Sequence, residues 1–236
     1  MSSENYTKKS AMNSTVGLLT SVVSCLLGFV SRYIFLHILT TEYLGVNGLF
    51  SNVLTILSFA ELGIGEAMVY AMYKPMKNND KEKMLMLVNL YKKFYLIIAS
   101  VVLLIGIILS FFLDFLIAEK PDIPENLQVL FALFLVNNVA SYLMAHKQSI
   151  LVVDQRKYVV ALVSQFIHVV NLVLQCIVLL LTRNYYLYLV CQIFGTLAIN
   201  LILTIYVNRN YPWFKQKTSS KLEKEEKNNI FKDIKA

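Results

Sequence analysis

The sequence is poor in charged residues and proline. Asp, Glu, Lys and Arg make up 16% of its 236 residues, against 57% hydrophobic residues, and it has four prolines. Its three cysteines, Cys25, Cys176 and Cys191, all lie within apolar stretches. Because their number is odd and their separations match no metal-ligand pattern, a disulfide framework and a cysteine metal site are both excluded. We interpret them as small apolar residues.

Long apolar stretches are what the sequence has in abundance. Six of them reach or exceed the roughly 20 residues that a membrane-spanning helix needs. They predict an all-α integral membrane protein, a six-transmembrane-helix bundle over residues 14–208. A short arm, 1–13, precedes the bundle, and a basic tail, 209–236, follows it. The predicted helices are residues 14–39, 45–73, 94–115, 127–153, 158–181 and 186–207.

Lysine and arginine are concentrated in every second connection between these stretches. Of the 22 basic residues, 19 lie in the N-terminal arm, in the connections 74–93 and 147–157, or in the tail. The positive-inside rule assigns these segments, and with them both termini, to the cytoplasm. The net charge of +7 then reflects basic groups that lie against lipid headgroups. We expect anionic membrane lipids, and not nucleic acid, as partners of these groups.

Three charged residues, Arg32, Glu61 and Glu66, lie inside the predicted spans, where a charge costs about 2.5 to 3.5 kcal/mol. Arg32 is predicted roughly 12 Å below the outer boundary, at the depth of Asn52. Its side chain either extends to the outer headgroups or faces a water-filled cavity that receives an anionic ligand. Glu66 is close enough to Lys74 to reach the cytoplasmic interface.

Glu61 is the deepest of these charges. The hairpin geometry places it roughly 24 Å below the outer boundary, level with Ser24, so a direct salt bridge with Arg32 is not expected. Three alternatives remain for Glu61: it is protonated, hydrogen-bonded across helices, or exposed to water in a cavity.

Polar and small residues recur at intervals of three and four along most of the predicted helices, which gives each one a polar face. Ser24 belongs to such a face on the first helix, Ser58 to one on the second, and His168, Asn171 and Gln175 to one on the fifth. These faces either let the helices pack closely and hydrogen-bond, or form a hydrated polar pathway. No second His or carboxylate follows His168 at helical spacing, so no metal site is predicted.

The sequence lacks the patterns of an enzyme that acts on lipid phosphates. Such enzymes need clustered acids to hold a divalent metal ion. The aspartates outside the tail stand singly, on different sides of the membrane or in different loops, and no glycine-rich phosphate loop or activated nucleophile is present. We therefore expect no catalytic activity and no cofactor.

Residues 31–95 carry a family resemblance. The run SRYIFLHILTTEYLGVNGLFSNVLTILSFAELGIGEAMVYAMYKPMKNND, followed by LYKKFY, resembles the first two helices and first cytoplasmic loop of the polysaccharide transporter family. This family of oligosaccharide flippases belongs to the multidrug/oligosaccharidyl-lipid/polysaccharide exporter superfamily. The signal combines the first-helix arginine, the YLGVNGLF turn, the AELGIG block and the YKP motif. In general character the similarity extends over all six predicted helices.

The resemblance implies a carrier in the bacterial cytoplasmic membrane. It would move an undecaprenyl-pyrophosphate-linked oligosaccharide from the inner to the outer leaflet for export of a surface polysaccharide. Arg32 matches the family's cavity arginine, which binds pyrophosphate, and Glu61 matches the acid of its second-helix block. With Asn52 they form the predicted substrate-binding set.

Chain length separates this protein from the family it resembles. Family members have two six-helix lobes that move against each other, whereas this chain resembles the N-terminal lobe alone. We therefore expect a fragment or one product of a split gene, which needs a second lobe as partner. Two alternatives stay open: an exporter of drugs coupled to cations, from the same superfamily, and a non-transporting membrane scaffold in polysaccharide assembly.

Overall fold

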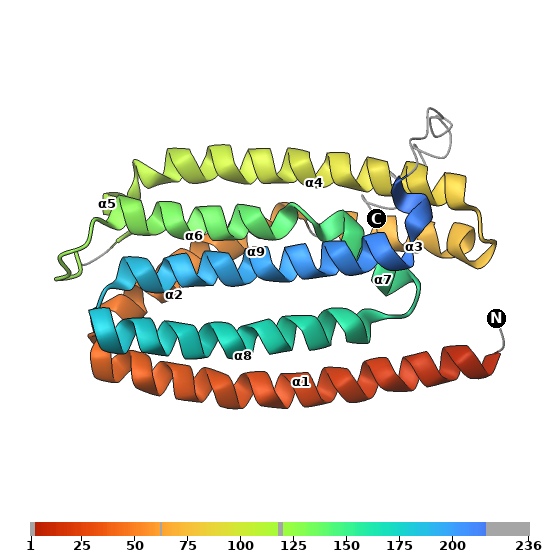
Figure 1. Ribbon diagram of the computed structural model, residues 1–236. Helices are drawn as coiled ribbons and strands as arrows, with labels where there is room; N and C mark the ends of the chain where they lie inside the picture. Colours follow the sequence, from red (N-terminus) through yellow and green to blue (C-terminus); the bar gives the residue numbers. More distant parts are fainter. Residues whose placement is uncertain (1–2, 62, 118–119, 216–236) are drawn as a thin grey trace.

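A computed structural model describes residues 3–61, 63–117 and 120–215, and these contain helices and no strand (Figure 1). Two short 3-10 turns, Phe59–Glu61 and Pro212–Lys215, accompany the α-helices. Residues 216–236, most of the predicted basic tail, lie outside the described part of the chain. The α-helices are α1 (Ser3–Ile38), α2 (Thr41–Ser58), α3 (Ile64–Lys77), α4 (Lys81–Ser110), α5 (Leu113–Leu116), α6 (Leu127–Tyr142), α7 (Ala145–Val153), α8 (Lys157–Thr182) and α9 (Tyr185–Asn210).

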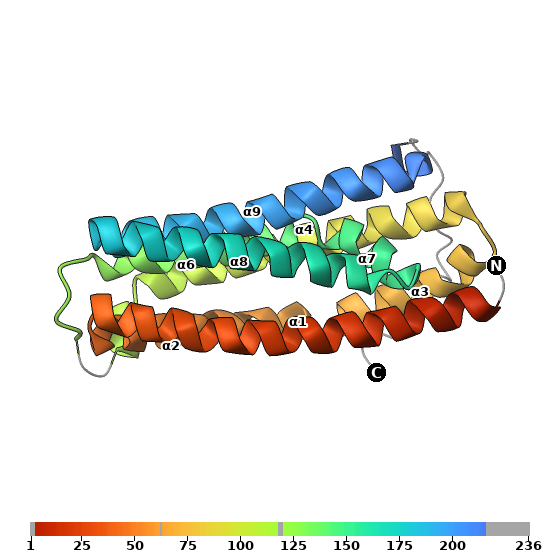
Figure 2. The same ribbon diagram turned by 60° about the horizontal axis from the view of Figure 1, so that its bottom comes forward.

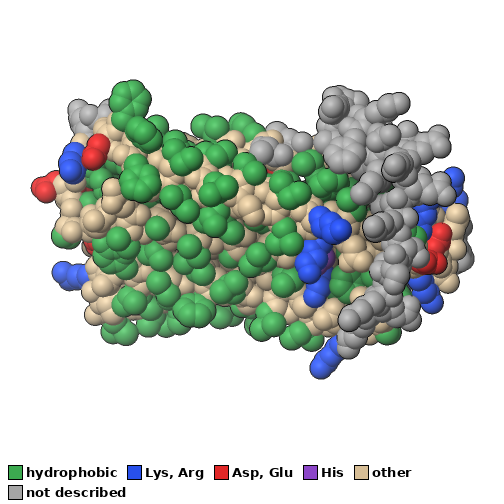
Figure 3. Space-filling view, turned by 90° about the horizontal axis from the view of Figure 1, so that it is seen from above, with side chains coloured by type: hydrophobic (Ala, Val, Ile, Leu, Met, Phe, Trp, Pro, Cys, Tyr) green, Lys and Arg blue, Asp and Glu red, His purple; other side chains and the backbone are tan. Residues whose placement is uncertain are grey.

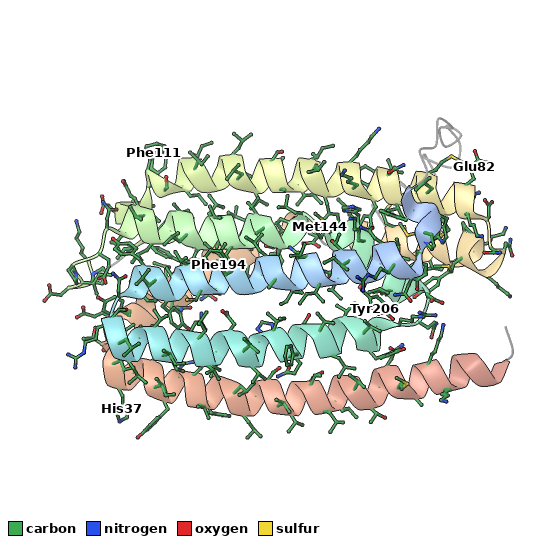
Figure 4. The ribbon with its side chains drawn as sticks, viewed as in Figure 1. His37, Glu82, Phe111, Met144, Phe194 and Tyr206 are labelled. Carbon is green, nitrogen blue, oxygen red and sulfur yellow. The ribbon has the colours of Figure 1, made fainter. Side chains whose placement is uncertain are left out.

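The long helices run up and down beside one another, so alternate connections meet at the same end of the bundle (Figure 1). His37 and Phe111 mark one end, and Glu82 lies at the other (Figure 4). Three turns are tight because one residue in each adopts a left-handed conformation, namely Asn79, Gln155 and Arg183. The start of α1, the α3–α4 turn and the α7–α8 turn share the end that was predicted to be rich in basic residues.

The chain is a membrane protein by the length and apolar character of its helices. Four helices of the described part, α1, α4, α8 and α9, are long and apolar enough to cross a bilayer. A fifth span results if α6 and α7, which meet at a bend of 43° near Met144, are counted together (Figure 4). The prediction of six spans is therefore confirmed only in part.

The predicted span 45–73 is not one continuous helix. It divides into α2 and α3, separated by the 3-10 turn Phe59–Glu61 and by Gly63. Gly63 has a φ of 87°, a conformation that a side chain makes unfavourable, and this ends the helical hydrogen-bond ladder. Averaged hydropathy did not reveal the interruption, because the apolar residues of α2 and α3 flank the segment that holds Glu61, Gly63 and Gly65.

Two of the other predicted helices begin earlier in the structure than the sequence indicated. The third span was expected at 94–115, but α4 begins at Lys81, where the Asp80 side chain accepts a hydrogen bond from the Lys83 backbone N–H. With 30 residues, α4 is about 45 Å long, so its lysine-bearing first turns extend beyond a hydrocarbon core of roughly 30 Å. The first helix likewise begins at Ser3 and not at residue 14.

An aromatic cluster joins α2 and α6 in the buried core. Phe50 is fully buried and contacts the rings of Phe131 and Phe134 edge to face, with centroids 5.2 and 5.7 Å apart. By contrast, α1 packs mainly along α8 and exposes large apolar side chains, such as Leu18 and Phe29. Hydrophobic side chains cover most of the face seen in Figure 3, and most charged side chains lie toward its ends. This surface suits a lipid environment.

Candidate functional site

A cavity of about 560 Å³ lies among α1, α2, α6, α8 and α9. We call it the amide cavity, because amide side chains dominate its polar lining. Figure 2 shows α1 and α2 on one side of the molecule and α8 and α9 on the other, with the cavity residues contributed by both sides. The amides and their polar neighbours include Asn137, Gln165, His168, Asn171, Gln192 and Thr196.

The amide cavity lies near the middle of its helices. Asn171 is in the central turns of α8, and Thr196 is in those of α9. For helices that span a bilayer, this position corresponds to the midplane, where carriers hold their substrates and ions. Asp, Glu, Lys and Arg are absent from the lining. The site is thus polar but uncharged, with groups that both donate and accept hydrogen bonds.

Hydrogen bonds across helices fix part of this lining. Ser24 Oγ donates to Gln165 Oε1 at 2.7 Å, which joins α1 to α8. Thr196 Oγ1 donates to Asn137 Oδ1 at 2.7 Å, which joins α9 to α6. The Gln165 Nε2 atom is buried without a partner. A buried donor of this kind is costly unless water or a ligand satisfies it, so the lining is only partly saturated.

Gly195 sets the width of the amide cavity between α8 and α9. A Cβ atom at this position would lie 2.8 Å from Asn171 Nδ2 and 2.9 Å from Asn171 Cγ. Any side chain there would therefore push the Asn171 amide away from its present place. Gly28, across the cavity on α1, has no atom within 4 Å of such a Cβ and carries no similar constraint.

The structure brings together four of the five residues of the predicted polar pathway. Ser24, His168, Asn171 and Gln175 all line the amide cavity, whereas Ser58 does not. Ser58 is hydrogen-bonded on the other side of α2, where it accepts from Tyr142 OH at 2.7 Å. The helical period placed these four residues on faces that line the cavity, although Ser24 and His168 remain exposed.

The predicted substrate-binding set is not brought together. Arg32 and Asn52 are exposed, on α1 and α2, and neither lines the amide cavity. Glu61 lies at the interruption between α2 and α3. Neither Arg32 nor Glu61 is among the described ion pairs. The binding roles of Arg32 and Asn52 stay predictions.

Sequence reasoning missed Asn137 and Gln165. Asn137 is adjacent to Asn138, which donates to Ser58 Oγ at 3.4 Å. Gln165 is three residues before His168 on α8. Gln165, His168 and Asn171 are separated by three residues each, which is close to the helical period. This spacing could have assigned Gln165 to the same face as the other two.

Glu61 has a separate polar environment. It accepts a hydrogen bond from Tyr95 OH on α4, and Tyr91 OH donates to Tyr95 OH at 3.3 Å. Of the three alternatives for Glu61, a hydrogen bond across helices and exposure to a cavity are both present. That cavity, the Glu61 cavity, has a volume of about 1000 Å³ and is lined in part by Glu61, Glu66, Tyr70, Tyr91, Tyr95 and Lys157.

A charged cluster, the Asp154 cluster, ties the basic-rich end of the bundle together. Asp154 Oδ1 lies 3.0 Å from Lys9 Nζ, and Oδ2 lies 2.8 Å from Arg156 Nε. Tyr211 OH donates to Asp154 Oδ2 at 2.7 Å. Burial and this hydrogen bond raise the pKa of Tyr211 above its usual value. The cluster connects α1, the α7–α8 turn and the segment after α9.

Asn13 reinforces the same connection. Its Nδ2 donates to the Gln155 carbonyl at 3.0 Å, and its Oδ1 accepts from the Tyr158 backbone N–H at 2.8 Å. Gln155 has a φ of 59°, so the turn that Asn13 holds is a strained one. The first helix is thus fixed to the start of α8 by both charge and hydrogen bonds.

Comparison with known proteins gives no relative from which to assign this chemistry. No protein-family model, curated protein or solved structure matches the chain. Within the described ranges, no group of three or more His, Cys, Asp or Glu side chains is placed to hold a metal ion. The side chains of the cavities are therefore the basis for a functional proposal.

Proposed function

We propose that this chain is one lobe of a carrier that moves an undecaprenyl-pyrophosphate-linked oligosaccharide across the bacterial cytoplasmic membrane. The observation that carries the proposal is the amide cavity, an uncharged polar site at mid-length of helices that can span the bilayer. A packed helical bundle without a polar ligand has little reason to keep a partly unsatisfied site there. The resemblance of residues 31–95 to polysaccharide transporters supports the same conclusion.

The lining of the amide cavity suits sugar hydroxyl groups. Asn171 and Gln192 each offer a carbonyl oxygen and an NH₂ group, and a sugar hydroxyl can both donate and accept. The unpartnered Gln165 Nε2 is a donor that such a hydroxyl would satisfy. A neutral lining also avoids the desolvation penalty that a fixed charge would impose on an uncharged oligosaccharide.

Arg32 is placed to meet the charged part of such a substrate. It follows Gly28, which lines the amide cavity, by one helical turn, and is therefore on a neighbouring part of the same side of α1. Its guanidinium is exposed, always charged and shaped to bind phosphate oxygens in pairs. In this arrangement the sugar occupies the cavity, and the pyrophosphate binds near its rim.

The proposal includes the orientation and a partner. Both termini face the cytoplasm, as the basic connections at the shared end of the bundle indicate. A second six-helix lobe, from a longer chain, another gene product or another copy, faces the polar sides of α1 and α2. Movement of the two lobes against each other would expose the cavity alternately to the two leaflets.

The lining of the amide cavity does not suit a cationic drug, whereas the Glu61 cavity, with two carboxyl groups and several tyrosines, is the kind of site that an exporter of such drugs needs. A cationic drug requires an acidic group to neutralise its charge in the bilayer, and the amide cavity contains none. Its aromatic lining is also sparse, with Tyr188 and the imidazole of His168. A protein that serves only as a membrane scaffold does not need a polar cavity at mid-length of its helices.

Complementation tests the proposal. A strain that lacks its own oligosaccharide flippase should regain surface polymer when this chain is co-expressed with a matching C-terminal lobe, and not when the chain is expressed alone. In the two-lobe protein, Arg32→Ala should abolish polymer export at unchanged membrane abundance, and Arg32→Lys should retain part of it. Lys120→Ala, which removes an exposed cation from the loop before α6, is the matched control.

Two results would contradict the proposal. Normal export by the Arg32→Ala protein would show that the arginine only extends to the headgroups. Full complementation by the chain alone, with a monomeric mass in mild detergent, would show that a second lobe is not needed.

A further inference from the structure

Two lysines on neighbouring helices lie close together on an outer face of the bundle. Lys92 of α4 is exposed, and Lys147 of α7 is half-buried. Their ammonium groups are near enough to repel each other, and both also act electrostatically on the imidazole of His146. Figure 3 shows basic side chains on an otherwise apolar face, apart from the ends of the molecule. We call these three residues the Lys92–Lys147 site.

Neither lysine has an acidic partner in the described part of the chain. The ion pairs found there include neither Lys92 nor Lys147. Lys147 is held instead by an aromatic ring, since its Nζ atom lies 5.7 Å from the centroid of Phe214. Two like charges that are kept together without a counter-ion destabilise each other, so an anion bound between them would be stabilised by both.

His146 adds a polar group that lacks a partner. Its side chain is 4% exposed, and its Nδ1 atom is buried without a hydrogen bond. A buried polar atom of this kind is costly unless a ligand or water satisfies it. An imidazole N–H is a donor, and the oxygens of an anion are acceptors. The site therefore combines two cations with a neutral group that an anion can satisfy.

The depth of the site corresponds to the headgroup region of a bilayer. Lys147 follows Leu127, the first residue of α6, by 20 residues, which rise about 30 Å, the thickness of the hydrocarbon core. Phe214 contacts Lys147 at this level, and the ring of Trp213 lies 6.2 Å from that of Phe214. Aromatic side chains, tryptophan above all, are typical of the membrane interface.

We propose that the Lys92–Lys147 site binds the phosphate group of an anionic phospholipid from the leaflet at the basic-rich end of the bundle. The two ammonium groups bind phosphate oxygens as point charges, and the His146 imidazole donates a further hydrogen bond. The acyl chains lie along exposed apolar residues one turn deeper on α4, namely Leu96 and Ile97. Basic sites between helices on the cytoplasmic side of a membrane are suited to such headgroups.

A lipid fits this site better than a soluble anion does. The three residues line neither the amide cavity nor the Glu61 cavity, so the site opens toward the bilayer and not toward an internal path. A lipid phosphate is already at this depth, because its acyl chains anchor it in the membrane. The buried imidazole and the lysine held against Phe214 also distinguish the site from a single exposed lysine, which attracts anionic lipid only weakly. The inference does not depend on the proposed carrier function.

The fluorescence of Trp213, the one tryptophan of the chain, reports on lipid at this site because its ring is next to that of Phe214. The full chain is reconstituted in phosphatidylcholine vesicles that contain a small fraction of brominated lipid, since bromine quenches tryptophan on contact. Brominated phosphatidylglycerol should quench Trp213 more strongly than brominated phosphatidylcholine at the same mole fraction. Lys92→Gln and Lys147→Gln should each weaken this preference about fivefold.

Three further variants separate the site from general surface charge and from changes in folding. Lys74→Gln removes an exposed lysine of α3 at the same end of the bundle and should leave the preference unchanged. Lys92→Arg keeps the charge and should retain the preference. His146→Phe keeps an aromatic ring but removes the unpartnered nitrogen, and it should weaken the preference while both lysines are present.

Three results would overturn the proposal. The first is a preference for phosphatidylglycerol that survives the replacement of both lysines by glutamine. The second is an equal loss of preference in Lys74→Gln, which would reduce the effect to general surface charge. The third is full relief of the quenching by inorganic phosphate at constant ionic strength, which would assign the site to a soluble anion. Because no transport substrate is used, a failure of polymer export leaves these measurements unaffected.

Discussion

The amide cavity and the Asp154 cluster are both polar and both join several helices, but they treat their polar groups differently. In the cluster, one carboxylate is matched by two cations and a tyrosine hydroxyl, with 14% of its side chain exposed. In the cavity, the polar groups are neutral, and Gln165 Nε2 has no partner. The cluster is at an end of the bundle, and the cavity is at mid-length.

This difference indicates different tasks. A set of opposite charges that neutralise one another fixes helices in place, even though Arg156 Nε, 2.8 Å from Asp154 Oδ2, is buried without an aligned hydrogen bond. A set of amides with open hydrogen-bonding capacity holds helices more loosely and can exchange one partner for another. We therefore expect substitutions in the cluster to affect stability and substitutions in the cavity to affect transport.

The largest effect is expected for Asp154→Asn. Removal of this charge leaves Lys9 and Arg156 without their counter-ion in a site that is mostly shielded from water, at a cost of about 3 kcal/mol in the free energy of unfolding. Denaturation by SDS in mixed micelles, followed by circular dichroism, measures it. Asp114→Asn is the control, because its pair with Lys120 is 3.9 Å long and highly exposed, and it should cost less than about 1 kcal/mol. Equal losses in both variants would show that the cluster has no special role.

Asn13→Ala should have the next largest effect. The variant loses two hydrogen bonds and leaves the Tyr158 backbone N–H without its side-chain acceptor, which should cost about 2 kcal/mol in the same denaturation experiment. Asn210→Ala is a suitable control, since its side chain bonds only to the Tyr206 carbonyl within its own helix. If the two variants are equally stable, Asn13 does not hold α1 to α8.

For the cavity, Gly195→Ala should lower polymer export by the two-lobe protein about tenfold, which corresponds to about 1.4 kcal/mol. The added methyl group displaces the Asn171 amide into the space that the substrate needs, while the stability of the protein changes little. Gly28→Ala, on the opposite wall, adds a methyl group without a contact and should export normally. Loss of export in both variants, or in neither, would show that the width of the cavity at Gly195 does not control transport.

The smallest effect is expected for Ser24→Ala. It removes the bond between Ser24 and Gln165, and cavity water can replace that bond, so the cost should be about 0.5 kcal/mol of unfolding free energy. Ser21→Ala, which loses only a bond to the Gly17 carbonyl of the same helix, provides the reference. A loss above about 2 kcal/mol for Ser24→Ala would mean that the cavity lining is as rigid as the cluster.

Much of the helical arrangement follows from hydropathy, and part of the site follows from helical period. The stretches 158–181 and 186–207 correspond to α8 and α9 within a few residues, because both helices are apolar along their whole length. His168, Asn171 and Gln175 were assigned to one face, and that face lines the cavity. Local pattern was enough in these cases.

The remaining features depend on contacts between distant segments or on backbone conformation. Tyr95 has the sequence features of an interface aromatic, but it is buried against Glu61 because α4 starts at Lys81 and carries it deeper into the bundle. Whether Asn137 or Asn138 faces the cavity depends on the rotation of α6, which its sequence does not specify because its apolar residues are spread over all sides of the helix. The break at Gly63 depends on the positive φ angle of this residue, which the sequence does not specify.

That break also has a consequence for how the chain enters the membrane. Recognition of a nascent helix as a span depends on the summed transfer free energy of its residues, and α2, which carries Asn47 and Asn52, is not among the helices apolar enough to qualify alone. We expect α2 to need a neighbour, either α1, to which a short turn joins it, or α4, to be accepted into the bilayer. Biogenesis of this chain would then proceed by pairs of helices and not one span at a time.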